Sequence, residues 1–119
     1  MILNQTLLKV CDNSGIKVVK CFKVYKHKTA SIGDIFLSSV KDIKSKSKLK
    51  KGDIVKGIVV RKKKLLNRFT GNFMLFDYNE VVLLNNKNEL LGTRVFGPIV
   101  LELRKRGFVK LLSLASFLI

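Results

Sequence analysis

The sequence predicts a mainly β fold, a small five-stranded antiparallel β-barrel with a protruding β-hairpin and short C-terminal helices. Short apolar segments rich in β-branched residues recur along the chain, and turns rich in Gly, Asp and Asn separate them. Two of these segments follow a Gly-Asp pair, Gly33-Asp34 and Gly52-Asp53, as if one type of turn were used twice. Helix-like segments come only near the end, and strands followed by helices favour a barrel with a helical appendix.

Five segments are predicted to form the barrel. In chain order they are Thr6–Cys11, Ile16–Tyr25, Ile35–Val40, Ile54–Val60 and Glu80–Leu84. Asp12-Asn13-Ser14-Gly15 separates the first two and is a turn, because Asp and Asn bond nearby backbone and Gly accepts a positive φ. Even positions of the second strand are expected to face inward, broken only by Lys20: they are Ile16, Val18, Phe22 and Val24.

A basic hairpin is predicted between the last two barrel strands, with arms at Val59–Leu66 and Phe73–Phe76. After the barrel, Ile99–Lys105 is expected to be a helix that stops at Gly107, and Val109–Ser113 a strand or a second helix. The chain is interpreted as one domain, with the barrel over residues 1–86 and the appendix over residues 87–119.

The composition indicates a globular protein with a polyanionic partner. The chain has 119 residues, of which 47% are apolar, enough for a core of its own. Its 24 Lys and Arg face eight acidic residues, a net charge of +16. Such an excess opposes compaction unless a polyanion neutralises it. Nucleic acid is the favoured partner, and an anionic membrane surface is the alternative.

Half of the basic residues, 12 of 24, lie in the window Lys41–Arg68. Those on either side of its apolar run are predicted to contact RNA: Lys44, Lys46, Lys48, Lys50, Lys51, Arg61, Lys62, Lys63, Lys64 and Arg68. Loop cations attract phosphates whatever the sequence, which suits the shape of a folded RNA. A free-standing single-strand-binding barrel, with Phe69 as its stacking residue, is a second possibility.

Catalysis, metals and cofactors are not indicated. The acidic residues are scattered, His27 is the single histidine, and no glycine-rich phosphate-binding motif occurs. Cys11 and Cys21 lack the spacing of a metal or redox pair and are predicted to be reduced core residues. The apolar tail from Leu111 is about half the length that spans a bilayer. Met1–Thr6 does not have the features of a signal peptide.

Several short motifs follow one another in a recognisable order. They include Asp12-Asn13-Ser14-Gly15, Lys50-Lys51-Gly52-Asp53, Gly57-Ile58-Val59-Val60-Arg61, Val82-Leu83-Leu84-Asn85-Asn86 and Gly92-Thr93-Arg94-Val95-Phe96-Gly97-Pro98. In this order and at this spacing, the chain closely resembles the universal large-subunit ribosomal protein family L-fourteen.

This resemblance implies a non-catalytic structural constituent of the large ribosomal subunit that takes part in translation. It implies binding to large-subunit rRNA near the subunit interface and bridging to small-subunit rRNA. Ribosomal proteins of the L-three and L-nineteen families would be neighbours. A ribosome-silencing factor would contact Thr93, Arg94 and Lys110.

The chain departs from the family pattern in places. Tyr78 stands where the family commonly has Gly, and the tail Ser116–Ile119 is more apolar than expected. The preference for Lys over Arg, with many Asn and Ile, fits AT-rich coding. We therefore expect an organelle-encoded, mitochondrial member, with an AT-rich bacterium or a plastid as alternatives.

Overall fold

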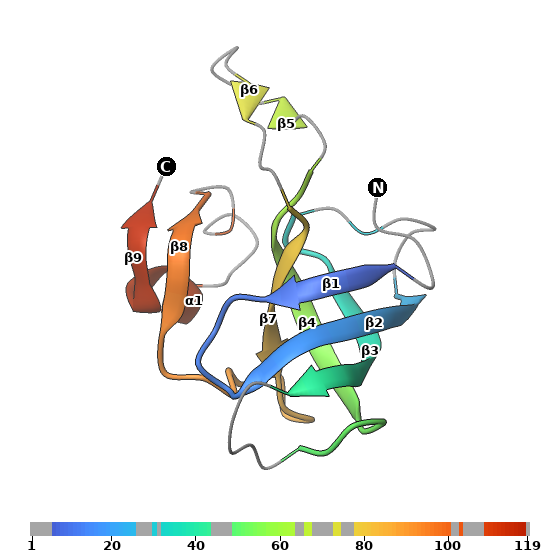
Figure 1. Cartoon of the computed structure of the whole chain (residues 1–119). Coiled ribbons are helices and arrows are strands. Elements are labelled where there is room, and N and C mark those ends of the chain that lie inside the picture. The colour runs from blue at the N-terminus through green and yellow to red at the C-terminus, as the bar shows by residue number, and fades with distance from the viewer. Residues whose placement is uncertain are drawn as a thin grey trace.

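Five strands of the computed structural model close into a barrel (Figure 1). The structure describes residues 6–25, 30, 32–43, 49–63, 66–67, 73–74, 78–100, 103 and 109–118. The barrel strands are β1 (Leu7–Val10), β2 (Ile16–Val24), β3 (Ile35–Ile43), β4 (Ile54–Arg61) and β7 (Glu80–Leu84), and they are hydrogen-bonded in that order around the barrel. Each coincides with a predicted segment to within a few residues, so the predicted five-stranded barrel is confirmed.

The barrel is not antiparallel throughout, and that part of the prediction is wrong. Four of the neighbouring pairs are antiparallel, but β1 pairs with β7 in parallel, with Lys9 opposite Glu80 and Val10 opposite Val81. The reason is parity. When an odd number of alternating strands closes on itself, the first and last strands run in the same direction and must pair in parallel.

Bulges in β2 change which of its side chains face the core. Its register to β3 shifts between Ile16 and Val18 and again between Val18 and Val19. The first shift leaves Lys17 as an extra residue in β2 and moves the following β2 side chains to the other face, whereas the second leaves Lys41 as an extra residue in β3 and does not change which way β2 faces. Val19 and Cys21 are therefore fully buried, whereas Phe22, predicted to face inward, is 37% exposed.

The two Gly-Asp turns have the same geometry. Gly33 and Gly52 have φ values of 89° and 91°, a region that favours glycine. The N–H of Gly33 donates to the Val59 carbonyl and that of Gly52 to the Val40 carbonyl, both at 2.9 Å. In return, the N–H of each valine donates to the carbonyl of the aspartate that follows the glycine. One turn type is used twice, as the sequence predicted.

The predicted hairpin is present as two short antiparallel strands, β5 (Leu66–Asn67) and β6 (Phe73–Met74). They lie beyond one end of the barrel (Figure 1). The tip of the predicted hairpin, residues 68–72, and Phe69 with it, lies outside the described residues.

The C-terminal unit contains a helix that includes Val109–Ser113, where a strand or a helix was predicted, but it does not begin with a helix at Ile99. It consists of β8 (Val95–Ile99), α1 (Val109–Leu114) and β9 (Ala115–Leu118), and β8 and β9 pair in parallel. Within the described residues α1 is the one α-helix, and Ile99 ends a strand instead of starting a helix. The sequence did not predict β8 as a strand, because it contains Gly97-Pro98, a pair that is uncommon in strands.

Two apolar cores hold the protein together. One fills the barrel and includes Leu8, Val19, Phe36 and Leu83, all fully buried. The other joins the outer side of β4 and β7 to the C-terminal unit, and its members include Ile58, Val60, Val82, Leu84, Ile99, Leu103 and Leu111. Strands β4 and β7 thus have apolar side chains on both faces, which explains their continuous apolar sequences.

Cys11 and Cys21 are free thiols within these cores, as predicted. Burial raises the pKa of the Cys11 thiol to about 12, and it also raises the pKa of Cys21 above its ordinary value. Both thiols therefore stay protonated at neutral pH, where a thiolate would be needed for nucleophilic or metal chemistry.

Candidate nucleic-acid interface

Several acidic side chains are used inside the fold. The Asp12 carboxylate accepts hydrogen bonds from the N–H groups of Ser14 and Leu83, both at 3.1 Å. Asp34 is buried, and Glu80 forms an ion pair with Arg61. Asp12 and Glu80 thus stabilise a turn and contacts between strands, and neither Asp12 nor Asp34 lies at the surface among the exposed lysines.

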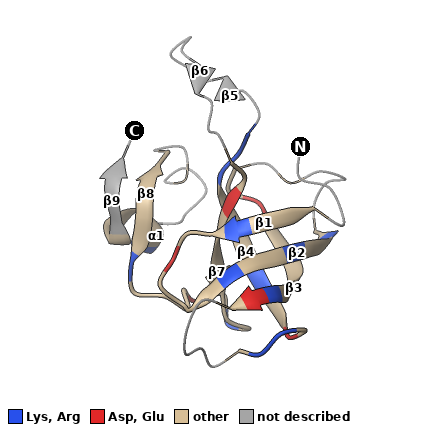
Figure 2. Ribbon diagram, viewed as in Figure 1, with Lys and Arg blue, Asp and Glu red and all other residues tan. Residues whose placement is uncertain are grey.

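The lysines, in contrast, lie on the outside. Among the described residues those with exposed side chains are Lys9, Lys17, Lys23, Lys41, Lys50, Lys51, Lys63, Lys87 and Lys110. Figure 2 shows basic residues on the barrel strands and on the turn that leads into β4. A surface of this kind attracts a polyanion and releases the counterions that the polyanion held.

The turn before β4 presents two of the predicted RNA-binding residues. The Lys50 N–H donates to the Asp53 carboxylate at 2.8 Å, and the Asp53 N–H donates back to the Lys50 carbonyl at 3.1 Å. This closed turn leaves Lys50 and Lys51 exposed. The predicted residues Lys44, Lys46 and Lys48 lie outside the described residues.

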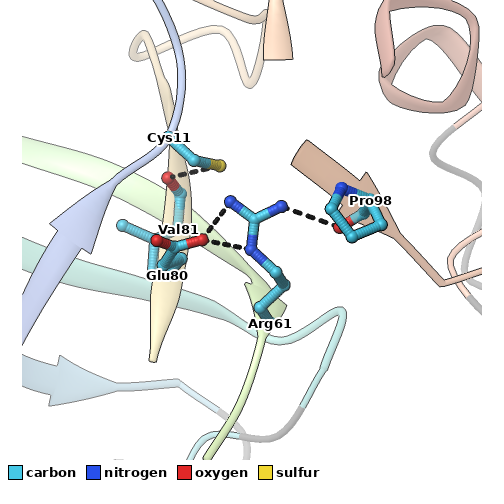
Figure 3. Close-up of polar contacts among 5 residues, drawn as sticks. All are labelled: Cys11, Arg61, Glu80, Val81 and Pro98. Carbon is cyan, nitrogen blue, oxygen red and sulfur yellow. Dashed lines mark hydrogen bonds and ion pairs between the residues drawn. The ribbon is translucent and has the colours of Figure 1, made fainter. Parts of the chain in front are cut away.

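Arg61 is placed differently from the other predicted RNA-binding residues. Its Nε and Nη2 groups contact Glu80 Oε2, and its Nη1 group donates to the Pro98 carbonyl at 2.7 Å (Figure 3). Its side chain is only 9% exposed. The guanidinium therefore links β4, β7 and β8 and holds the C-terminal unit against the barrel.

The residues that follow Arg61 return toward the surface. Lys62 is half-buried and Lys63 is exposed. The N–H of Lys63 donates to the side-chain carbonyl of Asn79 at 2.8 Å, which fixes this segment beside the start of β7. The last two predicted residues, Lys64 and Arg68, lie outside the described residues.

Thr93 and Arg94 belong to a second surface, next to the C-terminal unit. The side-chain oxygen of Asn13 accepts hydrogen bonds from the N–H groups of Thr93 and Arg94, at 2.7 and 3.0 Å. The Asn13 amide also donates to the Thr93 hydroxyl at 2.8 Å. A β-carbon at Gly92 would lie 2.7 Å from this Asn13 oxygen, so the contact needs glycine there.

A hollow of about 630 Å³ lies between this turn and α1. Thr93 and Lys110 both line it, and Leu84, Leu90 and Leu114 supply much of its apolar wall. The structure thus brings Thr93 and Lys110, 17 positions apart in sequence, to one hollow, with Arg94 exposed beside Thr93.

Sequence reasoning missed two contributors to these surfaces. Asn13 was assigned only to a local turn, and nothing in its spacing indicates partners 80 positions away. Tyr78 is the other: it is exposed and lies under the ammonium group of Lys9. The sequence could have indicated this residue, because Tyr78 stands where the family commonly has glycine.

The described residues contain no group of three or more metal-ligating side chains. None of the described helices has the length and apolar character needed to cross a membrane.

A closed β-barrel with many exposed lysines, in which Asp12 and Asp34 are buried, is typical of a small polyanion-binding protein. A family model described as Ribosomal protein L14p/L23e matches residues 1–119, so the chain belongs to this ribosomal protein family. The resemblance seen in the motifs is confirmed. Members of this family are structural, non-enzymatic constituents of the large ribosomal subunit that bind rRNA in the company of other ribosomal proteins.

Proposed function

We propose that the chain binds large-subunit rRNA near the subunit interface and supports a bridge to small-subunit rRNA. The observation that carries the proposal is the contrast between exposed lysines and acids engaged within the fold. A rigid barrel presents these cations in fixed positions, so phosphate contacts can form with little loss of backbone entropy.

Within the predicted set we assign the phosphate contacts to the lysines and to Arg68, and we assign Arg61 to the fold. Lys50, Lys51 and Lys63 are exposed on well-defined turns. Arg61 already has Glu80 and Pro98 as partners and would have to break both contacts to reach a phosphate. Lys44, Lys46, Lys48, Lys62 and Lys64 complete the proposed set.

Charge reversal at the turn before β4 tests this assignment. The double variant Lys50→Glu/Lys51→Glu should bind large-subunit rRNA about tenfold more weakly, with a plot of log K against log salt that is less steep by about two. Filter binding or anisotropy between low and moderate salt measures both quantities. Lys87→Glu/Lys110→Glu changes the net charge equally on other surfaces and should have a clearly smaller effect. An unchanged slope, or equal losses in both variants, would contradict the assignment.

We also propose that the hollow beside α1 receives a ribosome-silencing factor, with Thr93, Arg94 and Lys110 as contacts. The support is that Thr93 and Lys110 line the same apolar hollow and that Asn13 holds the turn carrying Thr93 and Arg94. Lys110→Glu should weaken binding of the purified factor at least tenfold. Lys87→Glu, an exposed lysine on the turn after β7, is the matched control. Equal binding of both variants would remove this surface from the proposal.

The neighbours in the subunit are proposed to be the L-three and L-nineteen proteins, and the compartment to be the mitochondrion. The preference for Lys over Arg fits an AT-rich genome such as that of a mitochondrion, and a plastid or an AT-rich bacterium is the alternative. Sedimentation of the protein with mitochondrial large subunits, and cross-linking within them, tests both statements.

A further inference from the structure

Three chain segments meet beside Tyr78, next to the proposed phosphate contact Lys63. The main-chain carbonyl of Asn79 accepts the N–H of Lys9 at 3.2 Å, and its side-chain carbonyl accepts the N–H of Lys63 at 2.8 Å. Asn79 thus joins β1, the segment after β4 and the segment before β7. Both lysines line the same hollow as Tyr78, the residue that precedes Asn79.

The tyrosine ring is presented to solvent with a cation beside it. The Lys9 ammonium lies 3.6 Å from the ring centroid, a cation–π distance. Tyr78 nevertheless remains 56% exposed. The contact with the ammonium group already restricts the rotation of the exposed ring. Stacking a base on this ring therefore costs less side-chain entropy.

A shallow hollow of about 310 Å³ adjoins the ring. Its described lining combines apolar atoms of Leu7, Leu8 and Val18 with Lys9, Lys63 and Asn79, and no acidic residue is among these described residues. On β7 the strand partner of Lys9 is Glu80, whose carboxylate is bound by Arg61. The volume of the hollow is at the low end of the roughly 300–1,000 Å³ range of small-molecule sites, a size that suits a single nucleobase.

We propose that Tyr78, Lys9 and Lys63 form a stacking site for one unpaired nucleotide of the rRNA. The base would stack on the Tyr78 ring, and the two ammonium groups would bind the adjoining phosphates. The proposal rests on the proposed rRNA-binding function and adds a base-dependent contact to phosphate binding. A protein neighbour against the same ring is the competing occupant, and it predicts no base-dependent effect of Tyr78 on RNA binding.

The chain provides its own control at Tyr25. It has two tyrosines, and Tyr25 is also exposed with a lysine near its ring, but Lys23 is 5.5 Å from that centroid. The full-length protein labelled with fluorotyrosine should give two fluorine NMR resonances. Oligoadenylate should shift the Tyr78 resonance and leave that of Tyr25 in place, whereas an abasic oligomer of the same length should shift the Tyr78 resonance much less.

Variants extend the test to affinity. Tyr78→Leu should bind oligoadenylate about tenfold more weakly, with unchanged binding of the abasic oligomer, and Tyr78→Phe should retain wild-type affinity. Tyr25→Leu should change either affinity by less than about twofold. A Tyr78 resonance that does not move, or equal losses for both oligomers, would overturn the stacking site. If the protein still bound rRNA in a salt-dependent way, only the stacking site would be overturned. If it did not bind rRNA at all, the proposed function itself would be overturned.

Discussion

Replacing Glu80 with alanine is expected to lower the free energy of unfolding by about 3 kcal/mol, the low end of the range for breaking a buried ion pair. The Arg61 side chain is 9% exposed and that of Glu80 is 21% exposed, so loss of the carboxylate leaves a charge with little water around it. Arg61 also donates to the Pro98 carbonyl, and the docking of β8 should weaken with it. Urea unfolding of the wild type and the variant measures the difference.

Two further variants sharpen this result. Glu89 is exposed, and its carboxylate accepts only a long 3.4 Å bond from Asn85, so Glu89→Ala should change stability by less than about 0.5 kcal/mol. The double variant Arg61→Leu/Glu80→Leu removes both charges and should recover much of the loss, to within about 1–2 kcal/mol of wild type. If Glu80→Ala were no more destabilising than Glu89→Ala, the ion pair would not hold the C-terminal unit in place.

Replacing Gly57 with alanine should cost about 2 kcal/mol, because the barrel interior has no room for the added methyl group. Gly57 lies opposite Phe36 in the β3–β4 pair, and Phe36 is fully buried. A β-carbon at Gly57 would lie 2.7 Å from the Phe36 Cζ atom. Small barrels fill their interior by placing large residues opposite small ones, and this pair is an example.

A double-mutant cycle separates packing from backbone effects. Shortening the ring in Phe36→Leu should relieve part of the cost of Gly57→Ala, with a coupling energy of about 1 kcal/mol. Gly52→Ala is the control: nothing lies within 4 Å of its added carbon, but its φ of 91° disfavours alanine. Its cost of about 1 kcal/mol should not respond to Phe36→Leu. A coupling energy of zero at Gly57 would mean that the ring moves freely away.

Much of the barrel was predictable because local signals agree with the tertiary structure there. The strands Ile54–Arg61 and Glu80–Leu84 are continuous apolar runs, and turns such as Gly52-Asp53 carry residues suited to positive φ. The face of β2 was not predictable, since its bulges depend on pairing with β3 and leave no mark in the pattern of residues. Strand β8 was missed for a related reason: its pairing with β9 outweighs the weak local preference of Gly97-Pro98.

The site was predictable as a region and not as a set of contacts. A run of basic residues indicates where a polyanion can bind, and Lys50 and Lys51 are exposed accordingly. The same run includes Arg61, whose role depends on Glu80 and Pro98, 19 and 37 positions further along the chain. Likewise Lys9, Lys63 and Tyr78 come together only because β1 closes the barrel against β7.

The sequence by itself determined the family, the positions of the barrel strands, the repeated Gly-Asp turn and the large positive charge. These are local or additive properties, which spacing and composition record directly. The tertiary structure alone decided which cations face solvent and which one holds the fold together. Burial and ion pairing arise between segments that are far apart in the chain. The free energy of a charged side chain therefore depends more on its spatial environment than on its neighbours in sequence.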